Sequence, residues 1–128
     1  MPELLIPLNG PKYVNAGESA KWSCTFSDLN SETLDSDAIT AITLTLKDES
    51  GNVVNSRSSQ TVRNANGGTL AASGSFTLIL SPLDNAYQSA AGFRERRYGE
   101  VSWDWTDENE ATQTGKTDFA YDVQKLPV

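Results

Sequence analysis

The 128-residue chain contains no histidine and only one cysteine, Cys24. Without histidine the protein lacks the usual general base at neutral pH, the usual activating partner of a nucleophile and the commonest zinc ligand. One cysteine cannot form a disulfide within the chain, so the class of small secreted domains held together by disulfides is excluded. We expect Cys24 to be a small buried hydrophobic residue rather than a reactive thiolate.

Positive charge is also scarce, because 10 Lys and Arg residues stand against 17 Asp and Glu residues and give a formal net charge of −7. Nucleic-acid affinity depends on clustered basic side chains, so we expect no nucleic-acid partner. No apolar run approaches the ~18 residues of a membrane span, which predicts no membrane association. Residues 1–7 lack the basic start and cleavage pattern of a secretory signal, which predicts synthesis in a reducing cytoplasm.

Alternation of apolar and polar residues with period two dominates the chain and is typical of half-buried strands. We predict five such strands, at residues 19–26, 41–47, 75–80, 98–105 and 117–123. Two weaker candidates, at 4–8 and 60–63, bring the expected total to about seven. The alternation places Trp22 in the core, and it places Trp103 and Trp105 there as well while Asp104 faces water.

Turn signals separate these strands. Residues 48–52 and 64–68 are rich in Asp, Asn, Ser and Gly and predict hairpin ends. The segment that follows the strand at 75–80 differs, because Ser81 suits an N-cap, Pro82 the first helical position and Asp84 the third. We therefore predict one short helix near residues 82–91.

Short alternating strands without long helices predict an all-β fold in which two antiparallel sheets pack face to face. The immunoglobulin-like β-sandwich is the member of this class that we expect. Neither a repeat nor a linker interrupts the pattern, so we expect residues 1–128 to form a single domain of this type.

The densest acidic region, residues 99–122, offers oxygen ligands for calcium around one hairpin. These are the side chains of Asp104, Asp107, Glu108, Asn109 and Glu110. Calcium requires about six or more converging oxygens, and the spacing is not that of an EF-hand loop. A solvated acidic hairpin explains the same residues, and we assign no metal-binding residue.

Two sugar-related alternatives remain open at the sequence level. Asp104 beside two tryptophans, together with Glu100, resembles the carboxylate pair of a glycoside hydrolase, although the alternation turns Asp104 toward water. Exposed tyrosines, Tyr98 or Tyr121, would make a carbohydrate-binding platform. Since no coherent site emerges, we predict a non-enzymatic protein with no catalytic residue and no cofactor.

The basic cluster Arg94, Arg96 and Arg97 lies beside Phe93 and Tyr98. Such a cluster resembles a phosphate contact, but the surrounding acidic charge opposes a polyanion. We expect these arginines to pair with carboxylates of the acidic hairpin or of a neighbouring subunit.

Several segments together resemble small virion proteins of tailed bacteriophages that have an immunoglobulin-like β-sandwich. They are residues 11–22 with Ala16-Gly17-Glu18-Ser19, residues 44–51 with Lys47-Asp48, residues 78–84 with Leu80-Ser81-Pro82-Leu83-Asp84, residues 95–105, and Phe119-Ala120-Tyr121-Asp122-Val123. The resemblance covers most of the chain, and its motifs mark strands and turns, so it transfers no catalytic residue.

The resemblance implies a structural protein of the virion, made in the host cytoplasm, that decorates the capsid or belongs to the head-tail neck, tail or baseplate. Its partners would be other virion subunits, and a homo-oligomer is also open. Sheet edges and the terminal segments 3–8 and 125–128 are the docking elements we expect. The alternative function is a carbohydrate-binding or host-adhesion module, with or without calcium.

Overall fold

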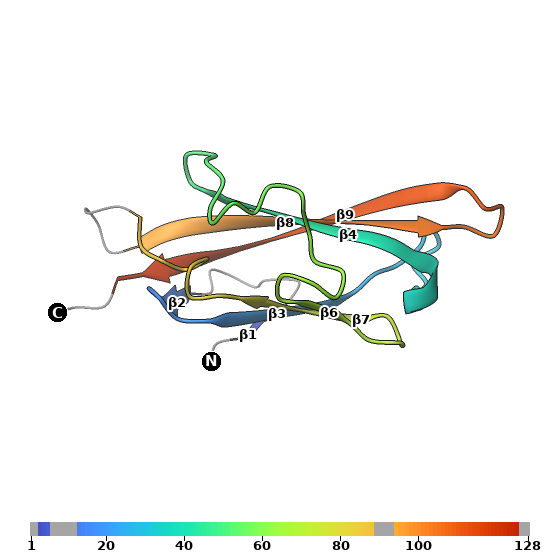
Figure 1. Ribbon diagram of the computed structural model, residues 1–128, viewed down its shortest axis with the longest axis horizontal. Coiled ribbons are helices and arrows are strands. Elements are labelled where there is room, and N and C mark those ends of the chain that lie inside the picture. Colours follow the sequence, from blue (N-terminus) through green and yellow to red (C-terminus); the bar gives the residue numbers. More distant parts are fainter. Residues whose placement is uncertain (1–2, 6–12, 89–93, 126–128) are drawn as a thin grey trace.

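The structure, a computed structural model, describes residues 3–5, 13–88 and 94–125, with residues 3–5 described by their backbone alone. Two β-sheets lie face to face (Figure 1). The elements in chain order are β1 (Glu3–Leu5), β2 (Tyr13–Asn15), β3 (Ala20–Thr25), the 3₁₀ turn η1 (Ser36–Ala38), β4 (Ile39–Asp48), β5 (Gln60–Thr61), β6 (Gly68–Leu70), β7 (Ser75–Leu80), β8 (Arg94–Thr106) and β9 (Thr112–Gln124).

One sheet has the strand order β1-β3-β7-β6 and the other has the order β2-β9-β8-β4-β5. The longest pairing joins β8 to β9, from Arg94 opposite Gln124 to Thr106 opposite Thr112. This hairpin extends to the end of the molecule that also carries η1 (Figure 1). The prediction of an all-β fold with two packed sheets is therefore confirmed.

Two features of the strand prediction were wrong. The described residues contain nine strands rather than about seven, because β2 and β6 are only three residues long and too short to show alternation. The sheets are also not wholly antiparallel, since β1 runs parallel to β3 and β2 runs parallel to β9. Alternation reports which face is buried and carries no information on strand direction.

Twenty-one buried apolar and aromatic residues form the core between the sheets. Trp22 is fully buried, and Trp103 and Trp105 are 8% and 4% exposed, so the predicted burial of all three tryptophans is confirmed. Trp22 stacks on Phe119, and Phe26 stacks on Trp103, each with ring centroids 4.8 Å apart. Trp22 of β3 thus contacts β9 of the other sheet, and Phe26, which directly follows β3, contacts β8.

Two strand glycines make room for these rings. Gly115 lies opposite Trp103 in the β8–β9 pairing, and Gly99 lies opposite Phe119. A Cβ atom at Gly115 would overlap the Trp103 indole, and one at Gly99 would overlap the Phe119 ring. Small residues at both positions therefore let each ring lie flat across its neighbouring strand.

The predicted helix near 82–91 is wrong in its described part. Residues 82–85 form consecutive turns, with Asp84, Asn85 and Ala86 each donating its backbone N–H to the residue three positions earlier. Helix growth requires free carbonyls, but those of residues 84–86 accept hydrogen bonds from Arg97 and from the Gly17 N–H. Tertiary contacts thus use the carbonyls that a helix needs, and residues 89–91 lie outside the described part.

Candidate interaction surfaces

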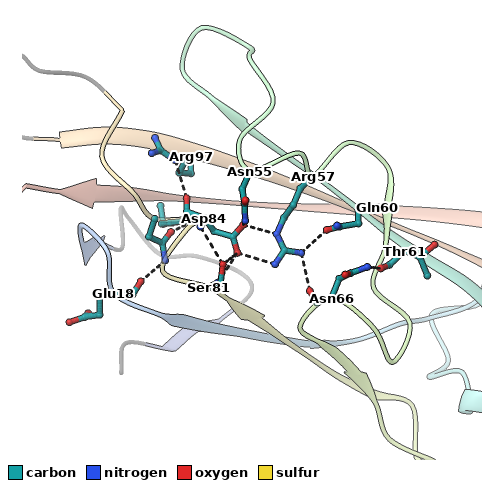
Figure 2. Close-up of polar contacts among 11 residues, drawn as sticks. Glu18, Asn55, Arg57, Gln60, Thr61, Asn66, Ser81, Asp84 and Arg97 are labelled. Atoms are coloured by element: carbon teal, nitrogen blue, oxygen red, sulfur yellow. Dashed lines mark hydrogen bonds and ion pairs between the residues drawn. The ribbon is translucent and has the colours of Figure 1, made fainter.

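A buried charged pair links the two long connections of the sandwich. The Arg57 guanidinium donates from Nε to Asp84 Oδ1 at 2.6 Å and from Nη2 to Asp84 Oδ2 at 2.9 Å (Figure 2). Arg57 is 5% exposed and Asp84 is fully buried. This two-point geometry is the strongest form of a carboxylate–guanidinium contact, and it fixes the position of both segments.

Neighbouring groups satisfy the rest of this pair. Asp84 also accepts from the Asn55 side chain and from the Ser81 backbone N–H, while Arg57 Nη1 donates to Gln60 Oε1 and to the Asn66 carbonyl (Figure 2). Asn85 extends the network, because its Oδ1 accepts from the Tyr121 hydroxyl at 2.7 Å. Both burial and the Asp84 charge raise the pKa of Tyr121, so this hydroxyl stays protonated.

The segment that carries Arg57 has an unusual backbone. Asn55, Ser56 and Ser59 all have positive φ angles, of 53°, 57° and 46°. Each such residue costs roughly 1–2 kcal/mol unless its surroundings impose the conformation. Here Arg57 supplies one anchor, and the Thr45 hydroxyl, which accepts from the Ser59 N–H at 2.9 Å, supplies another.

Beside this segment the outward face of the β2-β9-β8-β4-β5 sheet holds a groove of about 360 Å³. Tyr98 of β8 contributes the groove's aromatic ring and is 47% exposed. The remaining lining comes from polar groups of β4, the 53–59 segment, β8 and β9, mainly Thr45, Lys47, Ser58, Ser59, Glu100 and Asp118. We call this the Tyr98 groove.

The predicted arginine cluster divides between two faces of β8. Arg96 and Arg94 lie on the outward face with Asp122 of β9, at 3.0 and 3.8 Å, and Arg94 also lies 5.2 Å from the Tyr13 ring. Asp122 raises the pKa of Arg96 through a hydrogen bond and its charge, and Tyr98 adds to the effect. These arginines therefore pair with a carboxylate, as expected, but with Asp122 rather than with the 104–110 hairpin.

Arg97 faces inward and is fully buried, which the charge pattern alone did not predict. Its guanidinium donates to the Ala86 carbonyl at 2.9 Å and pairs with Glu95 at 3.1 Å. The inward position of Arg97 could have been predicted from strict alternation along β8. Arg97 lies two, four and six residues before Gly99, Val101 and Trp103, which all face the core.

One end of the sandwich concentrates the negative charge. Eight of the 17 acidic residues belong to the segments 26–38 and 104–113, which contain neither Lys nor Arg: Asp28, Glu32, Asp35, Asp37, Asp104, Asp107, Glu108 and Glu110. The two segments meet around a second groove lined by Asp28, Leu29, Trp105 and Asp107, among others. We call this part of the molecule the acidic end.

Three five-residue turns share one design, at residues 28–32, 48–52 and 107–111. The first residue of each is an aspartate whose Oδ1 accepts the backbone N–H groups two and four positions later, at 2.8–3.0 Å. The fourth residue, Ser31, Gly51 or Glu110, has a positive φ angle. Three of the acidic residues are thus turn-forming groups, which accounts for part of the acidic composition.

The candidate calcium residues do not converge. Asp107 closes its own turn and accepts from Gln113, and these bonds, led by that from the Ala111 N–H, lower its pKa. Asp104 accepts from the Thr114 hydroxyl at 2.7 Å. Within the described ranges, no three Asp, Glu or Cys side chains gather in a way that would hold a metal ion.

The two suspected hydrolase carboxylates lie on one face of β8, and their backbones are well separated. Glu100 and Asp104 lie four residues apart on β8, which separates their backbones by roughly 13 Å. Paired carboxylates of glycosidases lie about 5–9.5 Å apart. Glu100 lies instead 3.9 Å from Lys116.

Cys24, Tyr98 and Tyr121 differ in how far their side chains are buried. Burial raises the pKa of the Cys24 thiol to about 12, and the side chain packs against the core from a half-buried position. Tyr121 is fully buried and cannot present a platform, whereas Tyr98 is exposed. Of these two tyrosines, Tyr98 is thus the one whose ring reaches the surface.

The terminal segments are only partly described. Of residues 3–8, only the backbone of β1 is described; residue 125 is exposed, and residues 126–128 lie outside the described part. Among the described residues no helix is long and apolar enough to cross a membrane. No protein-family model, curated protein sequence or solved structure matches the chain.

Proposed function

We propose that this protein is a non-enzymatic structural component of a tailed-bacteriophage particle, made in the host cytoplasm and bound to other virion subunits. The proposal joins the sequence resemblance to such proteins with the strand order of the sandwich. It names capsid, neck and tail proteins as the candidate partners, and self-association as an additional contact.

The strand order is the observation that carries the proposal. Lettering in chain order makes β1, β3, β4, β6, β7, β8 and β9 the strands A to G, with β5 as an extra strand after C and β2 as an extra strand that runs parallel to G. With β2 and β5 left aside, the sheets have the orders A-B-E-D and G-F-C, and the likeness of these orders to those of immunoglobulin domains supports an immunoglobulin-like sandwich. One departure is the parallel β1–β3 pair, where that fold has an antiparallel one.

The geometry favours contacts through faces and loops rather than through sheet edges. Among the described residues, the edge strands β1, β6, β2 and β5 are each two or three residues long. Such short edges offer few free main-chain groups for strand addition by a partner. The outward sheet face and the acidic end present more surface for docking.

Size-exclusion chromatography with light scattering tests the proposal. The chain is run alone and then mixed with the head, neck and tail proteins encoded beside its gene. A stable complex with one of them is the expected result and identifies the position in the particle. A chain that elutes alone in every mixture contradicts the proposal.

A further inference from the structure

The Tyr98 groove has groups for a ligand that the fold itself does not use. Within the described part of the chain, no hydrogen bond or ion pair engages the side chains of Lys47, Ser58 or Asp118. All three side chains are exposed. Donors and acceptors therefore lie on opposite walls of the groove without internal partners.

Tyr98 supplies an apolar surface between these polar groups. It lies opposite Lys47 on β4 and opposite Ala120 on β9, so a small side chain flanks the ring on the β9 side. Alternation along β8 places the Tyr98 ring on the outward face, where it is 47% exposed. Arg96 lies on the same face and donates from Nε to Asp122 Oδ1 at 3.0 Å.

The opposite wall is anchored by contacts within the protein. Ser59 is held in its positive φ conformation by Thr45, and the buried Arg57–Asp84 pair fixes the segment two residues earlier. Strained non-glycine residues collect at ligand-binding positions, where the surrounding structure imposes them. A wall that needs no ordering on binding lowers the entropic cost of taking up a small ligand.

An aromatic ring flanked by carboxylates, hydroxyls and an ammonium matches the chemistry of a sugar. The C–H face of a pyranose ring packs on an aromatic face, while its hydroxyls donate to carboxylates and accept from Lys and Ser. Lys47 and the Lys116 ammonium beside Glu100 balance the charges of Glu100 and Asp118, so the groove has no excess of positive charge that would select an acidic sugar. A volume of about 360 Å³ accommodates one or two sugar units.

We propose that the Tyr98 groove binds a neutral saccharide, with Tyr98 stacking on the sugar ring and Asp118, Glu100 and Lys47 binding its hydroxyls. This activity goes beyond the proposed structural role, because it gives the particle a contact with glycans and requires no partner subunit.

The test is a glycan array probed with the full chain biotinylated at an added C-terminal peptide and coupled to streptavidin. Coupling four copies raises the apparent affinity by about 10²–10⁴, so a weak single site still gives signal. The array carries neutral oligosaccharides of glucose, galactose, mannose and N-acetylglucosamine beside sialylated and uronate-containing ones. Binding to at least one neutral series, with the acidic ones unbound, is expected.

Tyr98→Ala and Asp118→Asn are the test variants, and Tyr13→Ala is the matched control. Tyr13 is a tyrosine of similar exposure on the same sheet face but does not line the groove. We expect Tyr98→Ala to reduce array binding at least tenfold, Asp118→Asn about fivefold, and Tyr13→Ala less than twofold. Thermal melts establish whether each variant is folded. If Tyr98→Ala is unfolded, the test rests on Asp118→Asn.

Three results would overturn the proposal: no neutral glycan bound, binding restricted to acidic glycans, or an equal loss in Tyr13→Ala. None of them bears on whether the protein associates with virion subunits, so the two proposals succeed or fail separately.

Discussion

Arg57 and Asp84 form the most buried charged contact of the described residues, and their side chains are 6% and 0% exposed. Removing one member of such a pair leaves a buried charge without its partner. We therefore predict that Arg57→Met lowers the free energy of unfolding by about 3–5 kcal/mol. Urea denaturation followed by tryptophan fluorescence measures this loss.

Arg63→Met is the control for that variant, because Arg63 is a partly buried arginine that donates to the Ile39 carbonyl and pairs with no carboxylate in the part of the chain that the structure describes. Its loss is expected to cost about 1 kcal/mol. The double variant Arg57→Met/Asp84→Asn is expected to recover part of the loss. Equal effects of Arg57→Met and Arg63→Met would contradict the role of the charged pair.

Cys24 is predicted to react slowly with thiol reagents. Because burial raises its pKa to about 12, almost no thiolate exists at pH 8. A thiol of the unfolded chain ionises near pH 8.5. The buried, protonated Cys24 thiol therefore contributes its full stabilisation below about pH 8.5. This stabilisation is lost as the pH rises toward 12.

A colorimetric disulfide reagent applied at pH 8 measures this reactivity. The folded protein is expected to react at least tenfold more slowly than the protein in urea. A reaction as fast in the folded state as in urea would show that Cys24 is an accessible thiolate.

At the scale of elements, the shared turn design predicts how its fourth position responds to glycine. Glu110 and Gly51 occupy equivalent positions with φ angles of 61° and 84°. Glu110→Gly is expected to stabilise the protein by about 0.5–1 kcal/mol, since the left-handed conformation no longer crowds a Cβ atom. Gly51→Ala is expected to destabilise it by about 1 kcal/mol, although a Cβ there meets no other atom.

Chemical denaturation of both variants checks the two opposite signs. Destabilisation by Glu110→Gly would show that the Glu110 side chain, rather than its backbone conformation, stabilises the turn.

The Asp107 carboxylate links the β8–β9 turn to pH. Its pKa is lowered, so its stabilising bonds are present above the pKa of the unfolded chain and are lost as the pH falls through the lower pKa of the folded chain. Asp107→Asn keeps an acceptor for the turn and is expected to remove this dependence. An NMR titration of the Asp107 carboxyl should give a midpoint below the ordinary value of about 3.9, and a midpoint at or above that value would contradict the turn geometry.

The strand glycines give a further prediction for β8 and β9. A methyl group at Gly115 must displace the Trp103 indole, so Gly115→Ala is expected to cost about 1–3 kcal/mol. Thr114→Ala, at the adjacent exposed position, removes one hydrogen bond to Asp104 and serves as the control. A smaller loss for Gly115→Ala than for Thr114→Ala would mean that the indole can move aside.

The same elements show what the sequence could and could not predict. Alternation located all five strong strands and the three core tryptophans, because a half-buried strand must place its apolar residues on one face. It did not identify Asp84 as buried, since an aspartate after Ser-Pro-Leu suits a helix start as well as it suits a partner for Arg57. The Tyr98 groove also needs Ser59 and Asp118, which are distant in sequence and meet only through the register of β4, β8 and β9.

At the scale of the whole molecule, charge is distributed unevenly. Arg63 donates to the carbonyls of Ser36 and Ile39 and therefore belongs with the acidic end. The acidic end then has eight acidic residues and one basic residue, and the rest of the chain has nine of each. The formal charge of −7 therefore belongs to one end of the sandwich. Charge concentrated at one end produces an electrostatic field that orients a molecule as it approaches a charged partner. Salt weakens this effect.

We propose that this chain is a structural part of a phage particle. Quantitative mass spectrometry of purified particles, produced from the genome that carries its gene, tests that claim most directly. We predict that the chain is present at a fixed copy number per particle and remains after a salt wash. Particles that lack the chain, while the cell lysate contains it, would contradict the claim.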